Sequence, residues 1–216
     1  MKIQRLSKFL VATFVLAAAV AIALPVSAAT RDAVVRIGGC SGVCVDPAGI
    51  VLTAKHCEFG INESILFPEY GKVAATRIYV GPDAEDVVAF DCAGDGWPFV
   101  TVADEVPPVG SRVRSLGYPT SVAGRRNPGR GLITAAGTLL SGGEQTLMRN
   151  GRPQGKFLAN ETDLVTGPGW SGGPLFDKQD HVIGILSAGD AESTVFISWV
   201  ATRRAYDATV GRQIPQ

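Results

Sequence analysis

The sequence predicts an all-β fold that follows a removable leader and ends in a short helix. Three observations support this prediction: many short runs of β-branched and aromatic residues, clusters of Gly, Pro, Asp and Asn between those runs, and no helical apolar stripe before the last twenty residues. Many short strands at this spacing are typical of a β-sandwich or of β-barrels. The predicted strands lie at residues 34–37, 50–53, 77–80, 87–90, 113–116, 132–136, 157–159, 181–186 and 195–197, and the terminal helix at 199–210.

The first 28 residues have the three parts of a secretory signal peptide. Three basic residues lie within the first eight, an uncharged and mostly apolar run follows at 9–24, and Pro25 ends it. The small residues at 26–28 stand where a signal peptidase cuts. The alternative is a retained membrane anchor, but the apolar run of 16 residues is shorter than the roughly 20 that a spanning helix needs. We therefore predict an exported protein, secreted or periplasmic, with a signal peptide at 1–28.

The length and charge of the mature chain limit its class. Cleavage after Ala28 leaves 188 residues, which suit one compact domain or two small subdomains with a shared core. The whole chain has 20 basic and 20 acidic residues, and loss of the three basic residues of the leader gives a net charge of about −3. There is no basic surplus to indicate nucleic acid or an anionic membrane as a partner.

Four cysteines, Cys40, Cys44, Cys57 and Cys92, follow the export signal. An even number of cysteines in an exported chain predicts two disulfides, and three pairings remain possible from sequence alone. A zinc site is the weaker interpretation, because the chain has two histidines and no CxxC pair with tetrahedral zinc spacing. No metal and no cofactor are expected.

One histidine stands at the end of an apolar strand. Residues 49–57 read Gly-Ile-Val-Leu-Thr-Ala-Lys-His-Cys, so the strand runs into a turn of small residues that contains His56. A neutral imidazole can take a proton near neutral pH, which a hydroxyl nucleophile requires of its partner. A lone histidine at a strand end is more often structural, so this interpretation depends on two further motifs.

A carboxylate that can orient this histidine precedes another apolar strand. Asp86 comes immediately before the predicted strand at 87–90. A base histidine needs an acceptor at its second ring nitrogen, which sets the tautomer and stabilises the imidazolium. Asp86 is the predicted acceptor, and Asp83 and Asp91 are the alternatives.

Glycines lie on both sides of one serine. Residues 169–174 read Gly-Trp-Ser-Gly-Gly-Pro, and without a Cβ the glycines let the backbone turn tightly with its N–H groups directed into a cavity. Ser171 is the predicted nucleophile. The amides of Gly169 and Ser171 are the predicted oxyanion hole, where one donor lowers the barrier by about 3 kcal/mol. The alternative is a glycine-rich turn with a solvated serine, which the upstream histidine and aspartate disfavour.

These motifs resemble those of the trypsin/chymotrypsin family of serine proteases. Residues 53–57 resemble its histidine motif, 169–174 its serine motif, and 184–189 the strand that lines its specificity pocket and pairs with the substrate backbone. The likeness is greatest to compact bacterial HtrA-type proteases. The segments that carry it are Asp-Pro-Ala-Gly-Ile-Val-Leu-Thr at 46–53, Leu-Gly-Tyr-Pro at 116–119, Thr-Asp at 162–163, and 168–176.

The resemblance covers about residues 34–199 and implies a chymotrypsin-like fold. Two packed six-stranded antiparallel β-barrels are expected within 29–216, with the boundary near 105–120 and the active site between the barrels. The family also implies that Ser187 supports the triad aspartate. Its activity implies a polypeptide substrate. The charge balance predicts no nucleic-acid partner, and no apolar run after the leader is long enough to span a bilayer, so no membrane contact is expected after signal cleavage. The oligomeric state is left open.

Two further expectations come from the family. Families of this kind often bridge the residue after the histidine to the preceding strand, so Cys40–Cys57 is the preferred disulfide and Cys44–Cys92 the remaining pair. The predicted pocket floor, six residues before the nucleophile, is Val165. Together with Ala188 and Gly189 on the pocket strand, Val165 indicates a pocket for a small or apolar residue, since cleavage after Lys or Arg would need a carboxylate there.

One departure from the family raises an alternative function. Trp170 stands where trypsin has the aspartate that receives the new N-terminus and where HtrA-type enzymes usually have asparagine. An indole beside the nucleophile can either pack into the core, which we favour, or block the oxyanion hole. In the second case the chain would be a latent or inactive trypsin-like binding protein.

The second alternative is an esterase of the α/β-hydrolase kind, because residues 169–173 also satisfy G-x-S-x-G. That fold places its acid and its histidine after the serine. Here the single histidine after Ser171 is His181, only ten residues later, and the alternation of strands and helices is missing. His181 is therefore interpreted as a surface turn residue.

Overall fold

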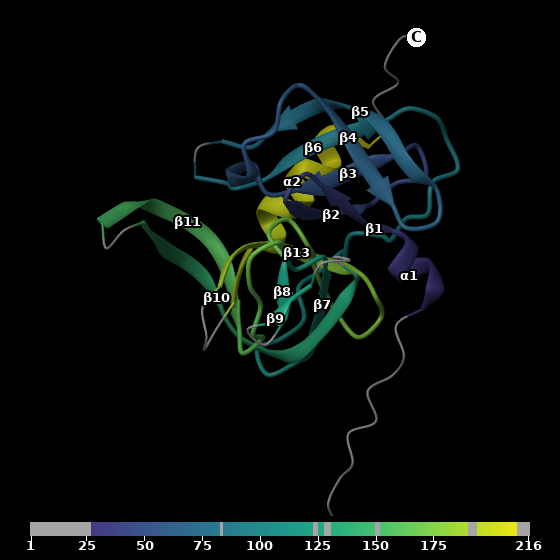
Figure 1. Ribbon diagram of the computed structural model, residues 1–216. Coiled ribbons are helices and arrows are strands. Elements are labelled where there is room, and N and C mark those ends of the chain that lie inside the picture. Colours follow the sequence, from purple (N-terminus) through teal and green to yellow (C-terminus); the bar gives the residue numbers. More distant parts are fainter. Residues whose placement is uncertain are drawn as a thin grey trace, which may run out of the picture.

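The computed structural model describes residues 27–82, 84–122, 125–127, 131–149, 152–189 and 194–210. The predicted signal peptide lies outside the described residues, except that Ser27 and Ala28 begin the short helix α1 (Ala28–Asp32), which Ser27 caps. Figure 1 shows two β-barrels packed one against the other, with α1 at the edge between them. No helix in the described part of the chain is long and apolar enough to cross a membrane.

The first barrel is a closed antiparallel sheet of six strands in the order β1-β2-β3-β6-β5-β4. Pairing of β1 with β4 closes it. A 3₁₀ turn, η1 (Lys55–Cys57), follows its third strand. The strands are β1 (Val34–Ile37), β2 (Cys40–Cys44), β3 (Ile50–Thr53), β4 (Asn62–Phe67), β5 (Gly71–Val80) and β6 (Val88–Cys92).

The second barrel is also a closed sheet of six strands, in the order β10-β11-β14-β13-β12-β7. Its strands are β7 (Arg112–Gly117), β10 (Ile133–Arg149), β11 (Arg152–Thr162), β12 (Pro174–Phe176), β13 (Val182–Gly189) and β14 (Thr194–Ile197). The β10–β11 hairpin extends beyond the barrel wall (Figure 1). A separate two-stranded sheet consists of β8 (Ser121–Val122) and β9 (Arg125–Arg126).

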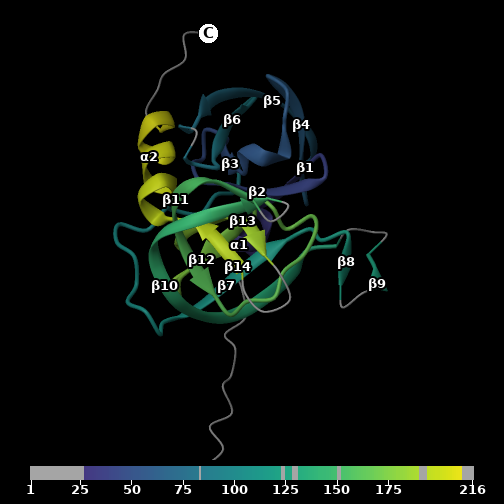
Figure 2. The ribbon, with the colours of Figure 1, turned by 90° about the vertical axis from the view of Figure 1, so that its left-hand side faces the viewer.

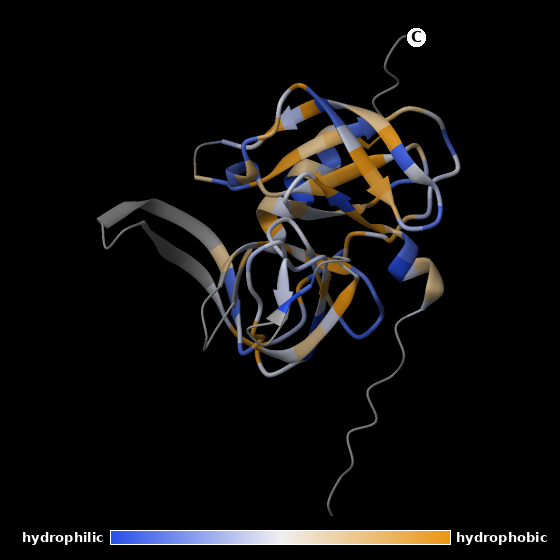
Figure 3. Cartoon of the chain, viewed as in Figure 1, coloured by the Kyte–Doolittle hydropathy of each residue, from blue (hydrophilic) through white to orange (hydrophobic). Residues whose placement is uncertain are grey.

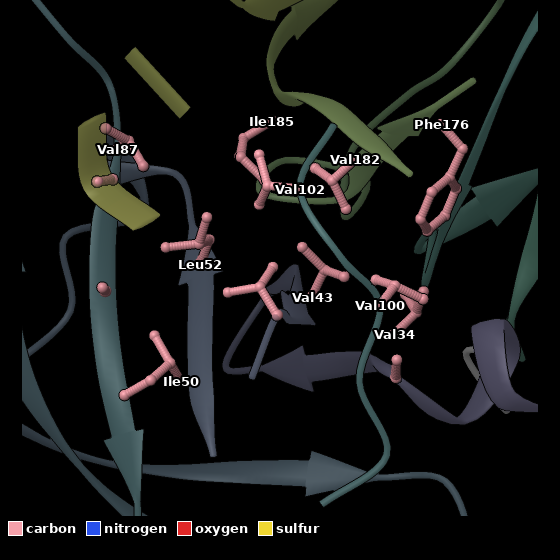
Figure 4. Packing of buried hydrophobic residues seen from close by; sticks show 14 of the residues in the cluster. Val34, Val43, Ile50, Leu52, Val87, Val100, Val102, Phe176, Val182 and Ile185 are labelled. Atoms are coloured by element: carbon pink, nitrogen blue, oxygen red, sulfur yellow. The ribbon is translucent and has the colours of Figure 1, made fainter. Parts of the chain in front are cut away.

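Strand β3 explains how the barrels are joined. All four of its residues are buried, because successive side chains of a strand point to opposite faces and both faces are covered here. Val51 packs inside the first barrel, whereas Ile50 and Leu52 point into a cluster shared with the second barrel. Figure 4 shows this shared cluster, to which the first barrel contributes Val34, Val43 and Val87 and the second Phe176, Val182 and Ile185.

The predicted C-terminal helix is present as α2 (Trp199–Thr209). Ser198 caps it, and Ala201 and Ala205 are buried in the shared cluster, so the helix belongs to the second half of the chain but packs beside the first barrel (Figure 2). Figure 3 shows that hydrophobic residues lie mainly in the strands and that many of the connecting loops are hydrophilic. The all-β prediction is confirmed, and so are the two six-stranded barrels that the family resemblance implied.

Candidate active site

The register of two strands brings the candidate base and acid together. In the antiparallel pair β3–β6, Thr53 lies opposite Val88. His56 lies in η1 just beyond β3 and Asp86 just before β6, so both stand at the same end of the pair. The backbone N–H of Lys55 donates to the carbonyl of Asp86 at 3.2 Å, which continues the ladder past the last paired residues.

Asp86 is held by three hydrogen bonds to its carboxylate. The backbone N–H of His56 donates to Oδ1 at 2.7 Å, and the hydroxyl of Ser187 donates to Oδ2 at 2.6 Å. The Nδ1 atom of His56 lies 2.5 Å from Oδ2. Because an ionised carboxylate can only accept, Nδ1 carries the proton and Nε2 of the neutral ring is left as the acceptor.

Ser171 lies directly in front of that acceptor. Its Oγ atom is 2.9 Å from Nε2 of His56, although the serine belongs to the second barrel and the histidine to the first. The structure therefore brings together Asp86, His56 and Ser171, the three residues that the motifs predicted. The competing Asp91 lies within β6, and Asp83 lies outside the described residues.

The turn that carries Ser171 depends on its glycines. Gly169 has φ +96° and Gly172 has φ +81°, a region that side chains rarely adopt. A Cβ at Gly169 would lie 2.6 Å from the carbonyl oxygen of Tyr118, and one at Gly172 would overlap Thr53 and the carbonyl of Ser41. Glycine is therefore required at both positions by conformation and by space.

The predicted oxyanion donors are available for a ligand. Within the described part of the chain, the amides of Gly169 and Ser171 donate no hydrogen bond. Their neighbours do: the Trp170 amide donates to Gly167 at 3.1 Å, and the Gly172 amide donates to Leu186 at 2.8 Å. The amides of Gly169 and Ser171, on either side of the bonded Trp170 amide, can therefore donate two hydrogen bonds to one oxygen of a ligand.

Trp170 packs into the second barrel. Its side chain is only 4% exposed and joins the interior cluster that contains Leu164, Leu175 and Ile183. A Cβ at Gly117 on β7 would lie 3.0 Å from the indole, so the ring rests on bare backbone. The indole thus fills the barrel core beneath the nucleophile turn and does not cover Ser171.

The predicted specificity residues lie in two segments, strand β13 and the loop after β11. Ser187 lies on β13 and bonds to Asp86, as described above. Ala188 is exposed on the same strand, and Gly189 pairs with Thr194 of β14. Val165 is 61% exposed in the segment between β11 and the nucleophile turn. The role of Val165, Ala188 and Gly189 in substrate selection stays a prediction.

The cysteines agree with one expected pairing and contradict the other. Cys40 and Cys57 form a disulfide, whereas Cys44 and Cys92 are free, buried thiols. The Cys44–Cys92 prediction is wrong because β2 and β6 pair with opposite sides of β3. Strands on either side of a third lie roughly 9–10 Å apart, beyond the Cα separation of about 7 Å that a disulfide tolerates.

Ser41 is a site residue that the sequence motifs did not reveal. This buried residue of β2 donates its backbone N–H to the carbonyl of Ser171 at 2.8 Å, and its Oγ donates to the carbonyl of Gly169 at 2.7 Å. Its position directly after Cys40 was the available signal, since the predicted disulfide brings that segment to His56. Among the described residues, no group of three His, Cys, Asp or Glu side chains is placed to hold a metal ion.

Comparison with known proteins identifies a family and relatives of this chain. The trypsin-like peptidase domain matches residues 40–185. Two curated proteins, both described as probable periplasmic serine endoproteases of the DegP-like kind, are similar: that of Halomonas elongata is 30% identical over 149 residues and that of Pseudomonas putida 28% identical over 150. Each alignment covers 68% of this chain and 28% of the relative, so the chain spans little more than a quarter of their length.

Solved structures share the fold. The active form of the Rv3671c protease from M. tuberculosis superposes with a TM-score of 0.68 at 21% identity, covering 88% of this chain and 85% of that one. The HtrA-type protease AlgW with tripeptide superposes with a TM-score of 0.67 at 19% identity, covering 84% of this chain and 61% of that one. At these identities the likeness concerns the fold.

Proposed function

We propose that this chain, which belongs to the trypsin-like peptidase family, is an exported serine endopeptidase that cleaves polypeptides through an acyl-enzyme. The observation that carries the proposal is the continuous series of contacts from Asp86 through His56 to Ser171, with distances of 2.5 Å and 2.9 Å. The DegP-like relatives are named as serine endoproteases, which supports the same reaction here.

Acylation begins with the Ser171 hydroxyl. Its oxygen attacks the carbonyl carbon of the scissile peptide bond while Nε2 of His56 takes the hydroxyl proton. The imidazolium that forms is stabilised by the carboxylate of Asp86, which stays ionised. Ser187 and the His56 amide both donate to that carboxylate, so it is held in place without a proton of its own.

The tetrahedral intermediate carries its negative charge on the former carbonyl oxygen. The unused amides of Gly169 and Ser171 are the proposed donors to that oxygen. Collapse of the intermediate breaks the C–N bond, and the imidazolium of His56 returns its proton to the leaving amine. Water then repeats the sequence on the ester of Ser171 and releases the second product with a carboxylate terminus.

The two alternative functions lose their supporting observations. The esterase interpretation required an α/β-hydrolase fold, whereas the strands form two closed antiparallel barrels. His181, its required base, lies at the end of a turn with Nδ1 3.4 Å from Oδ2 of Asp177, and within the described residues it forms no hydrogen bond with Ser171. The latent interpretation rested on Trp170, whose buried indole does not cover the nucleophile.

The substrate preference is proposed from the pocket residues, and the location from the relatives, the predicted signal peptide and the disulfide. Val165 and Ala188 are both uncharged, which favours cleavage after a small or apolar residue over cleavage after Lys or Arg. The relatives are named as periplasmic, and the predicted signal peptide and the Cys40–Cys57 disulfide also fit an oxidising compartment. The proposed location is therefore the periplasm or the exterior of the cell.

Digestion of an unfolded protein tests the proposed reaction. Reduced and alkylated casein is incubated with the mature chain, and the products are sequenced by mass spectrometry. New internal termini are expected with wild type and not with Ser171→Ala, and the residues before the cuts should be mainly small or apolar. Intact casein with folded wild-type protein would contradict the proposal, and cuts mainly after Lys or Arg would contradict the pocket assignment alone.

A further inference from the structure

Ser41 links the first barrel to the nucleophile turn through its side chain. Its Oγ donates a hydrogen bond to the carbonyl of Gly169 at 2.7 Å and accepts one from the backbone N–H of Tyr118 at 2.9 Å. The residue is 0% exposed, so no water can replace either bond if the hydroxyl is removed. One hydroxyl thus connects β2, the end of β7 and the turn before Ser171.

The peptide group on the other side of Gly169 is also held. The carbonyl of Pro168 accepts hydrogen bonds from the backbone N–H of Thr120 at 2.9 Å and from its Oγ at 3.2 Å. The peptide is trans, so the N–H of Gly169 points opposite to the Pro168 carbonyl and away from Thr120. The direction of the proposed oxyanion donor is therefore set by bonds that hold the peptides on both of its sides.

Because residue 169 is a glycine, the bonds from Thr120 and Ser41 are needed to fix its backbone conformation. Gly169 has no Cβ and can adopt φ values of either sign with little difference in energy, so its own conformational preference does not hold it at +96°. The Thr120 bonds fix the peptide before Gly169, and the Ser41 bond fixes the peptide after it. If the Ser41 hydroxyl is removed, the second peptide keeps only the bond from the Trp170 amide to the carbonyl of Gly167. Gly169 can then change its backbone angles, and its amide can move away from the direction of the oxyanion.

We propose that Ser41 is a positioning residue that holds the Gly169 amide in the orientation that binds the oxyanion. This inference rests on the proposed peptidase function and names the group that keeps the site preformed. The residue before the nucleophile, an aspartate in trypsin, is here the buried Trp170, and the carbonyl of Gly169 accepts its side-chain hydrogen bond from a hydroxyl of the opposite barrel.

The side-chain role of Ser41 can be separated from its backbone role. Its backbone N–H donates to Ser171 at 2.8 Å, and its carbonyl accepts from Oγ1 of Thr53 at 2.6 Å. Both backbone bonds persist in Ser41→Ala, which loses only the bonds to Gly169 and Tyr118. A matched control exists in Ser115, a serine of β7 that is also 0% exposed and whose hydroxyl has no hydrogen-bond partner among the described residues.

Two measurements on the mature wild type, Ser41→Ala and Ser115→Ala test the proposal. The first is saturation kinetics of acylation by p-nitrophenyl acetate, expressed per site titrated with a fluorophosphonate so that unfolded protein does not count. Removal of a single oxyanion donor lowers kcat by about a hundredfold to a thousandfold, and its misorientation should cost roughly tenfold to a hundredfold. We expect that loss in the acylation rate constant of Ser41→Ala, with no change in the saturation constant or in the midpoint of the acid limb of the pH profile.

The second measurement is the NMR resonance of the Gly169 amide, which needs no catalytic activity. It should shift and broaden in Ser41→Ala and remain as in wild type in Ser115→Ala. Ser41→Thr, which keeps the hydroxyl, should retain the wild-type resonance and rate, and it provides the test if Ser41→Ala does not fold.

Three outcomes are informative. An unchanged acylation rate and an unchanged Gly169 resonance in Ser41→Ala would overturn the inference. Equal effects in Ser41→Ala and Ser115→Ala would overturn it as well, because they would indicate a general loss of stability. A wild type that never acylates, but whose Gly169 resonance still depends on the Ser41 hydroxyl, would contradict the proposed function and leave the positioning role supported.

Discussion

The Nε2 atom of His56 lies 2.9 Å from the Oγ atom of Ser171, across the boundary between two separately closed barrels. A short path of bonds explains how a gap of 115 positions in sequence is held at that distance. His56 is followed by Cys57, whose disulfide partner Cys40 is followed by Ser41. The Ser41 amide then donates to the carbonyl of Ser171 itself.

Asp86→Asn is predicted to lower kcat on the order of 10⁴-fold, because an amide can present its N–H₂ to Nδ1 and favour the wrong tautomer of His56. The measurement is hydrolysis of a peptide substrate at pH 8. Asp91→Asn is the matched control, since Asp91 lies at the paired part of β6 and makes no contact with the histidine. A larger loss from Asp91→Asn than from Asp86→Asn would reverse the assignment of the acid.

Gly172→Ala is predicted to destabilise the protein by much more than backbone strain alone. Its φ is +81°, and the added Cβ would overlap Thr53 and the carbonyl of Ser41, both of which belong to the opposite barrel. Gly110→Ala provides the control, because Gly110 has φ +90° with no atom within 4 Å of the added Cβ. Strain at such an angle costs roughly 1–2 kcal/mol.

Urea unfolding of the two glycine variants gives the comparison. Gly110→Ala should lose about that strain energy, and Gly172→Ala should lose several times as much together with acylation by p-nitrophenyl acetate. Equal losses would show that the contact between the barrels at Gly172 is not tight.

The state of the cysteines is predicted to be one disulfide and two thiols. Cys44 and Cys92 are buried, so neither should react with a thiol reagent in the folded protein at pH 8. After unfolding in urea without reductant, two thiols per chain should react. A chain that shows none after unfolding would have formed the Cys44–Cys92 bridge, with β3 displaced from between its neighbours.

Stability is predicted to fall as the pH rises above 9. Burial raises the pKa of the Cys44 and Cys92 thiols from 9.0 to about 12. The unfolded chain therefore ionises these thiols near pH 9 while the folded chain keeps its protons, so their contribution is complete below pH 9 and is lost as the pH rises toward 12. Between these limits each thiol should lower the free energy of unfolding by about 1.4 kcal/mol per pH unit.

A double variant, Cys44→Ala with Cys92→Ala, isolates this effect. It lowers stability at pH 7 through lost packing, but its free energy of unfolding should fall less steeply between pH 9 and 11 than that of wild type. Parallel curves would indicate that the thiols do not titrate with folding. Tyr118, whose pKa burial also raises to about 12, contributes equally to both proteins.

The sequence predicted the catalytic candidates because each has a local signature. His56 and Asp86 stand at the ends of buried strands that pair with each other, and Ser171 lies in a turn where two glycines have positive φ. Every predicted strand corresponds to an observed one, because β-branched and aromatic runs mark strands that are buried on at least one face.

Three barrel strands and the two short strands β8 and β9 were missed, and the three barrel strands lack that composition. Strand β2 consists mostly of small residues, β4 begins with Asn-Glu-Ser, and β12 is only three residues long and begins with proline. Their pairing depends on partners in the barrel and not on local preference. The same dependence explains the error at Cys44 and Cys92, because only the strand order shows that β3 separates them.

The role of Ser41 could not be predicted for a related reason. Its hydroxyl acts on Gly169, 128 positions later. The neighbouring Cys40 places this segment beside His56, but it does not indicate a bond to Gly169. A site residue that lies within a recognisable local motif, as His56, Asp86 and Ser171 do, can be predicted from the sequence. Residues that hold another motif from the opposite barrel become visible only when the barrels are packed.

Labelling with a fluorophosphonate is the most direct test that Ser171 is a nucleophile activated by His56. The purified mature wild type is compared with Ser171→Ala, His56→Ala and His181→Ala, with circular dichroism to show that each is folded. Wild type and His181→Ala should label, and Ser171→Ala and His56→Ala should not. Folded wild type without label, or loss of label through His181 and not through His56, would contradict the proposed triad.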